Sequence, residues 1–276
     1  MRVQVFQMAS QPGDVERNLA RMDEMLHEAP PADLALFPEL AVTGYNLGRA
    51  FWDLAETADG SPSLGRISEM ARRHGRHIGV GFVERSVHTP GTLYDSLALI
   101  SPGGDLLAVY RKIHLWQEEQ QTFSRGRRLA VVEVQGVLVG LAICWDVAFP
   151  EVGRFLALGG AQVILLASAW DAPTIREWDI HVQARALENA VFVAASNRGG
   201  EESPLTYGGH SQILGPDGVP LAFARDTRDE VLTIEVDPEE VGRRRAQEAP
   251  YFRDRAPWAY RIPRVRSKRG ENSRRD

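Results

Sequence analysis

Cysteine is almost missing from this sequence, because Cys144 is the one cysteine among 276 residues. A single thiol cannot form a disulfide within the chain, and it cannot supply the several thiolates of a structural zinc site. We therefore expect no metal and a reducing, cytoplasmic compartment in which the thiol stays free. A free thiol is either a small buried hydrophobe or a nucleophile, and its neighbours must decide between the two.

Long apolar runs are missing as well. No segment approaches the roughly 20 consecutive apolar residues that span a bilayer, and residues 1–8 lack the apolar region and cleavage site of a signal peptide. We expect no association with a membrane.

Most of the chain also lacks an excess of positive charge. The net charge is -5, but residues 261–276 carry +5, which leaves -10 on the rest. We expect no nucleic-acid partner for the body of the protein. We interpret residues 1–260 as one domain and residues 261–276 as a basic, disordered tail, while contact of this tail with RNA or an acidic surface stays open.

Short apolar runs alternate with amphipathic segments along the chain. Asp14 precedes a segment with one apolar face, and Ser61-Pro62 and Gly75 mark the two ends of a second predicted helix. The pattern predicts an α/β fold with two mixed sheets covered by helices. The predicted strands are 3–8, 34–37, 78–83, 97–100, 106–112, 129–134, 137–143, 163–167, 191–195, 211–214, 221–224 and 231–236, and two further helices are predicted at 150–158 and 174–190.

Three predicted strands end in a chemically active side chain. Glu39 follows one, Lys112 ends another, and Cys144 comes directly after the apolar run 137–143. Strand ends are where α/β proteins gather active-site groups. None of the seven histidines stands at a strand end with an orienting acid close in sequence, and His114 comes nearest. A carboxylate is therefore the better candidate for the base that a thiol needs.

These residues lie in motifs that resemble those of the nitrilase superfamily of carbon-nitrogen hydrolases. The matching segments are Phe37-Pro38-Glu39-Leu40, Tyr110-Arg111-Lys112-Ile113-His114-Leu115, and Cys144-Trp145-Asp146 with Phe149-Pro150-Glu151. The resemblance covers nearly the whole of residues 1–260. It implies a four-layer α-β-β-α sandwich, and a homodimer or higher homo-oligomer in which sheets pair into a longer stack.

The resemblance also implies a role for each residue. Glu39 would be the general base, Cys144 the nucleophile, and Lys112 would stabilise an oxyanion together with the backbone N–H of Trp145. Lys112 would also lower the pKa of the thiol. A fourth catalytic residue is expected before Phe123, and we choose Glu119 over its neighbour Glu118. No cofactor is implied.

Three reactions share this apparatus, namely hydrolysis of an amide, of an N-carbamoyl compound and of a nitrile. The residues after Cys144 resemble the amidase and carbamoylase branches, and residues 44–48 resemble small aliphatic amidases, so we expect a small carboxamide as substrate and water as co-reactant. An N-carbamoyl acid remains an alternative substrate, because Arg176 stands near the place where similar carbamoylases bind a substrate carboxylate with arginine. The non-enzymatic alternative is a binding module that keeps the fold but has no catalytic activity. The expected substrate-binding residues are Tyr45, Asn46, Trp116, Phe123, Trp145, Trp170 and Asp171.

Overall fold

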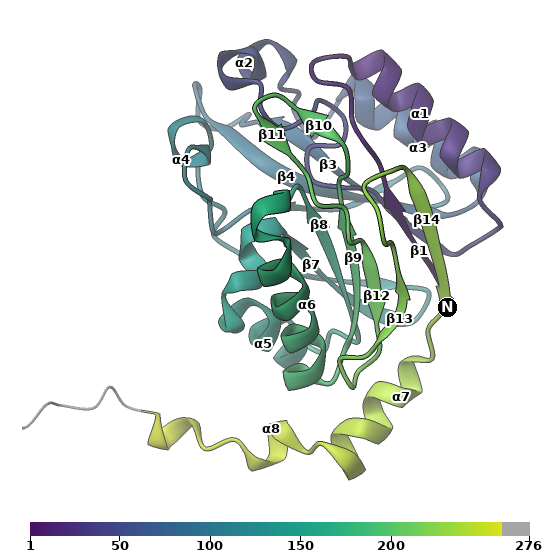
Figure 1. Ribbon diagram of the computed structural model, residues 1–276, viewed down its shortest axis with the longest axis vertical. Helices are drawn as coiled ribbons and strands as arrows, with labels where there is room; N and C mark the ends of the chain where they lie inside the picture. Colours follow the sequence, from purple (N-terminus) through teal and green to yellow (C-terminus); the bar gives the residue numbers. More distant parts are fainter. Residues whose placement is uncertain (261–276) are drawn as a thin grey trace, which may run out of the picture.

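The computed structural model describes residues 1–260, so the predicted disorder of the tail lies outside the described residues. Two six-stranded sheets form the centre of the molecule (Figure 1). The first has the order β14 (Glu230–Glu235), β1 (Arg2–Gln7), β2 (Leu34–Leu36), β3 (His77–Arg85), β4 (Leu93–Ile100) and β5 (Leu106–Arg111). The second has the order β13 (Pro220–Phe223), β12 (Gln212–Leu214), β9 (Phe192–Asn197), β8 (Val163–Ser168), β7 (Val137–Ile143) and β6 (Ala130–Val134).

Each sheet has three parallel strands at its centre and antiparallel strands outside them. In the first sheet β1, β2 and β3 run parallel, and in the second β7, β8 and β9 do. Candidate residues follow β2 and β7, so the carboxyl ends of central strands in both sheets supply the site. The prediction of two mixed sheets is confirmed.

Helices cover the outer face of each sheet (Figure 1). On the first sheet lie α1 (Val15–Glu28), which begins after the cap Asp14, and α3 (Pro62–His74), which begins after Ser61 and ends at Gly75, all as predicted. Gly75 has a φ of 63°, which glycine adopts without strain. On the second sheet lie α5 (Pro150–Leu158) and α6 (Ile175–Asn189).

Alternation along the central strands explains the four layers. Val3 and Val5 belong to the core that also holds Leu141 and Leu165 of the other sheet, whereas Phe6 belongs to the core under α1 and α3. Strand side chains alternate between the two faces, so one face of each sheet packs on the other sheet and the opposite face packs on helices. The predicted α-β-β-α sandwich is therefore confirmed.

Smaller elements surround these layers. Among residues 1–260, no helix has the length and apolar character needed to cross a bilayer. The hairpin β10 and β11 was not predicted from the sequence. The remaining elements are α2 (Phe51–Leu54), α4 (Glu119–Thr122), β10 (Glu201–Glu202), β11 (Leu205–Thr206), α7 (Pro238–Arg243) and α8 (Tyr251–Asp254).

Candidate active site

Cys144 occupies a sharp turn at the end of β7. Its φ is 43°, in a region that residues other than glycine rarely adopt, and a short 3-10 helix over Cys144–Ala148 begins at this residue. Such a turn projects a side chain away from the strand that precedes it. The side chain is 5% exposed and lines a cavity.

Asp146 holds this turn, a role that the sequence analysis did not assign. Its carboxylate is fully buried and accepts hydrogen bonds from the Tyr110 hydroxyl at 2.6 Å and from the Ile143 N–H at 3.1 Å. His114 donates its backbone N–H to Asp146 at 3.0 Å, and its ring stacks on Phe149. His114 is therefore built into the support of the turn, which explains why a histidine stands in this motif.

Glu39 follows β2 in a tightly packed backbone turn. Its Oε1 accepts a hydrogen bond from Lys112 Nζ at 2.5 Å, and its Oε2 accepts one from the Ala169 N–H at 2.7 Å. A Cβ on Gly81 of β3 would lie 2.3 Å from the Leu40 nitrogen and 2.7 Å from the Cα of Glu39. Only glycine lets β3 approach the turn this closely, so Gly81 helps to position Glu39.

Lys112 lies directly after β5 with no exposed surface. Its ammonium donates to Glu39 at 2.5 Å and to Glu119 Oε1 at 2.6 Å. Burial acts to lower the pKa of Lys112, but the negative charges of Glu119 and Glu39 raise it well above its ordinary value. The Lys112 side chain is therefore a protonated ammonium, and two carboxylates hold it in place.

Glu119 is the partner of Lys112, whereas Glu118 is exposed. The backbone N–H of Trp116 donates to Glu119 Oε2 at 2.8 Å, and the Tyr45 hydroxyl donates to Oε1. Burial raises the pKa of Glu119, an effect that Lys112 partly opposes. Of the two glutamates weighed from the sequence, the structure brings Glu119 to the cluster.

A third carboxylate, Asp95 of β4, was missed from the sequence. Its Oδ2 lies 3.5 Å from Lys112 Nζ, and neither oxygen has a hydrogen-bond partner although the side chain is fully buried. Burial, followed by the negative charge of Glu39, raises the pKa of Asp95 well above its usual range. The surroundings of Asp95 therefore favour its neutral, protonated form. The predicted strand began at residue 97, whereas β4 begins at Leu93, so Asp95 fell outside the predicted strand and nothing in the sequence marked it as a site residue.

The pKa of the Cys144 thiol differs from the value expected from the sequence. Burial, and next the negative charge of Glu39, raise the pKa of Cys144 well above its ordinary value, and Lys112 only partly opposes this. The prediction of a lowered thiol pKa was wrong, because burial and the negative charges of the carboxylates together outweigh the positive charge of Lys112. The resting group is a neutral thiol that needs a base.

The cavity beside Cys144 has a volume of about 250 Å³. The structure does not bring two of the predicted substrate-binding residues into its lining. Asn46 is exposed and donates its backbone N–H to Glu202 at 2.9 Å, and Phe123 packs on Phe51 in an apolar cluster. Arg176 is also absent from the lining. The lining residues are Tyr45, Trp116, Gln117, Cys144, Trp145, Ala169, Trp170, Asp171, Thr174, Glu177, Leu205 and Tyr207, which include the other five predicted residues.

Carboxylates of Glu39, Asp95 and Glu119 converge closely enough to hold a metal ion. Lys112 Nζ, however, lies 2.5 Å from Glu39 and 2.6 Å from Glu119. The ammonium thus occupies the position of a cation between these oxygens. The arrangement is suited to acid-base chemistry at a thiol, and the absence of a metal stays a prediction.

Comparison with known proteins agrees with this geometry. Residues 2–246 match the model of the family described as carbon-nitrogen hydrolase. The chain is 36% identical to a probable nitrilase of Schizosaccharomyces pombe (92% of this chain, 95% of that protein) and 34% identical to an (R)-stereoselective amidase of a Pseudomonas species (92% and 91%).

A solved structure shows the same fold with a modified cysteine. It is a Glu-to-Gln mutant of the amidase from Nesterenkonia sp. AN1, with covalent addition of the acetamide moiety of fluoroacetamide at the active-site cysteine. The TM-score is 0.82 at 28% identity, and the match covers 94% of each chain. The chain therefore belongs to the carbon-nitrogen hydrolase family.

Proposed function

We propose that this enzyme hydrolyses a small carboxamide to a carboxylic acid and ammonia through a thioester on Cys144. The observation that carries the proposal is the position of Cys144, which lines the cavity while Glu39, Lys112 and Glu119 act electrostatically on its thiol. The similarity to two amidases, the (R)-stereoselective amidase and the Nesterenkonia amidase, supports the proposal.

In the first half-reaction Glu39 takes the thiol proton as the sulfur attacks the amide carbon. An ammonium has three N–H donors, and Lys112 gives two of them to Glu39 and Glu119. The third, with the Trp145 N–H, would stabilise the oxyanion of the tetrahedral intermediate. Collapse of this intermediate breaks the C–N bond, and the proton held by Glu39 leaves with ammonia.

In the second half-reaction water hydrolyses the thioester. Glu39, again a carboxylate, takes a proton from water as the oxygen attacks the acyl carbon, and the proton returns to the sulfur when the C–S bond breaks. Glu119 would keep Lys112 in place through both steps and hold Tyr45 at the cavity wall. Water and the amide are the only reactants that this cycle needs.

The test is ammonia release from primary amides, N-carbamoyl compounds and nitriles of matched size, with mass spectrometry of Cys144 after short incubation. We expect amides to react fastest, a mass increase of one acyl group on Cys144, and neither signal in Cys144→Ala. Turnover by Cys144→Ala comparable to wild type would exclude the thioester. Nitriles or carbamoyl compounds as the fastest substrates would replace the amide in the proposal by one of these alternatives.

A further inference from the structure

The cavity beside Cys144 has an uneven distribution of charge. Two of its lining residues, Asp171 and Glu177, carry carboxylates, and no lysine or arginine of residues 1–260 is among the residues that line it. Two cationic residues close to lining residues in the sequence or the structure do not supply a positive charge to the cavity. Lys112 has no exposed surface and is held by Glu39 and Glu119, and Arg176 is exposed outside the cavity.

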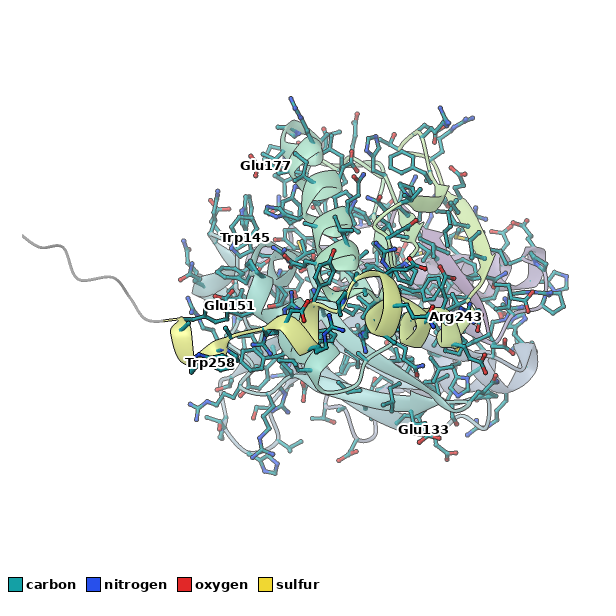
Figure 2. All side chains as sticks on the ribbon, turned by 90° about the horizontal axis from the view of Figure 1, so that it is seen from below. Glu133, Trp145, Glu151, Glu177, Arg243 and Trp258 are labelled. Atoms are coloured by element: carbon teal, nitrogen blue, oxygen red, sulfur yellow. The ribbon has the colours of Figure 1, made fainter. Side chains whose placement is uncertain are left out.

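The two carboxylates lie at one side of the cavity. Asp171 precedes the short 3-10 helix Ala172–Thr174 and accepts a hydrogen bond from the Thr174 hydroxyl, and the same hydroxyl accepts one from Trp170 Nε1 at 2.9 Å. Glu177 stands in the first turn of α6 and is exposed. Figure 2 shows Glu177 at the outer end of α6, on the same side of this view as Trp145. Both carboxylates therefore come from the short stretch between the end of β8 and the first turn of α6.

Aromatic rings form much of the remaining wall. Trp145 and Trp170 lie with ring centroids 5.5 Å apart, and Tyr45 and Tyr207 form an edge-to-face pair at 6.1 Å. Aromatic faces bind methylene chains and attract cations through the ring quadrupole, whereas they give no such attraction to carboxylates. An anionic acyl group in this cavity would meet two negative charges and no compensating cation.

We propose that the preferred amide carries an ammonium or another cationic group on its acyl chain, and that amides with a terminal carboxylate are rejected. This proposal rests on the amide hydrolysis proposed above and names the substrate class of the same site. The cationic group would lie near Asp171 and Glu177, with the apolar chain between the aromatic rings and the carboxamide at Cys144.

Three amides of equal chain length test the proposal, namely 6-aminohexanamide, hexanamide and the monoamide of adipic acid. We expect kcat/KM for ammonia release to be highest for the ammonium compound, intermediate for hexanamide and at least about tenfold lower for the carboxylate compound than for the ammonium compound. The ratio of the two charged substrates should shrink at high salt, because Glu177 is exposed to screening.

Matched charge-removing variants locate the effect. Glu177→Gln and Asp171→Asn should each lower the ammonium-to-carboxylate ratio about threefold or more. Glu133→Gln removes a charge from exposed Glu133 of β6, on the opposite side of the view in Figure 2, and should change the ratio less than twofold.

The outcomes separate the two proposals. Hydrolysis of all three amides without preference, or with the carboxylate compound preferred, overturns the charge selectivity and leaves amide hydrolysis intact. The same holds if Glu133→Gln alters the ratio as much as Glu177→Gln does. No ammonia from any of the three amides, while nitriles or carbamoyl compounds react, contradicts the proposed function and the selectivity together.

Discussion

The charged cluster around Lys112 and the cavity beside it place carboxylates in opposite surroundings. Glu39, Asp95 and Glu119 are buried and converge on one ammonium, whereas Asp171 is half-buried and Glu177 exposed, on an aromatic wall. Buried charges act strongly at short range and must be balanced by partners or by protonation. Carboxylates at the cavity act weakly, are screened by salt and are free to select a ligand.

The buried cluster is therefore expected to determine the catalytic rate, and the cavity wall is expected to determine which substrate is preferred. A change inside the cluster should alter the rate for every substrate, because it changes the proton balance at Cys144. A change at the cavity wall should alter the ranking of substrates.

Glu39→Gln should have the largest effect. The amide cannot take the thiol proton, and the raised pKa of Cys144 leaves little thiolate without a base. We expect kcat to fall about 1000-fold or more, in the range that general bases supply. Single-turnover and steady-state ammonia release measure this, with circular dichroism as a check of folding. A folded variant that works within tenfold of wild type would remove Glu39 from the mechanism.

Gly81→Ala should disturb the same residue through the backbone. The added Cβ would meet the Leu40 nitrogen at 2.3 Å, so the turn that carries Glu39 must shift. We expect the free energy of unfolding to fall by about 3 kcal/mol, at the upper end for overpacking, together with a loss of activity. Gly65→Ala on α3 is the control, because nothing lies within 4 Å of its added Cβ. Equal stability of the two variants in urea unfolding would contradict the close approach.

Glu119→Gln should cost less than Glu39→Gln, because Glu119 fixes Lys112 without taking the thiol proton. We expect kcat to fall about 100-fold, comparable to loss of one well-placed transition-state contact. Glu118→Gln is the adjacent control and should stay within twofold, since Glu118 is exposed. A larger loss in Glu118→Gln than in Glu119→Gln would reverse the assignment.

Motifs and strand ends were enough to predict the fold and three of the residues that meet in the cluster, whereas the fourth, Asp95, was missed. Glu39, Lys112 and Glu119 come from separate segments, yet the structure places them within hydrogen-bond distance of one another's charges. Sequence could not place Asn46, because its loop is held by Glu202 of the unpredicted hairpin, more than 150 residues away along the chain.

The protonation states of Asp95 and Cys144 also could not be predicted from the sequence. Asp95 lies outside the predicted strand 97–100, and only its distance of 3.5 Å from Lys112 shows that it joins the cluster. The direction in which the pKa of Cys144 shifts depends first on burial of the thiol and then on the charges of Glu39 and Lys112, and both require the folded arrangement.

Asp95→Asn should have the smallest effect on activity and a measurable effect on stability. A protonated aspartate and an asparagine are both neutral and similar in shape, so we expect kcat to stay within about fivefold of wild type. The pKa of Asp95 is raised in the folded state, so folding takes up a proton at a pH above the unfolded pKa of about 3.9. That contribution destabilises the wild type as pH rises and is absent from the variant.

The variant should therefore be more stable than wild type at pH 7, because folding of the wild type at this pH requires Asp95 to take up a proton and folding of the variant does not. The difference should shrink as pH falls, and vanish below the unfolded pKa, where both side chains are neutral in both states. Urea unfolding at pH 4, 5.5 and 7 measures it. A loss of activity as large as that of Glu39→Gln, or lower stability of the variant at pH 7, would mean that Asp95 is ionised. The negative charge beside Lys112 would then be part of the chemistry, and the cluster would carry one more charge than its hydrogen bonds support.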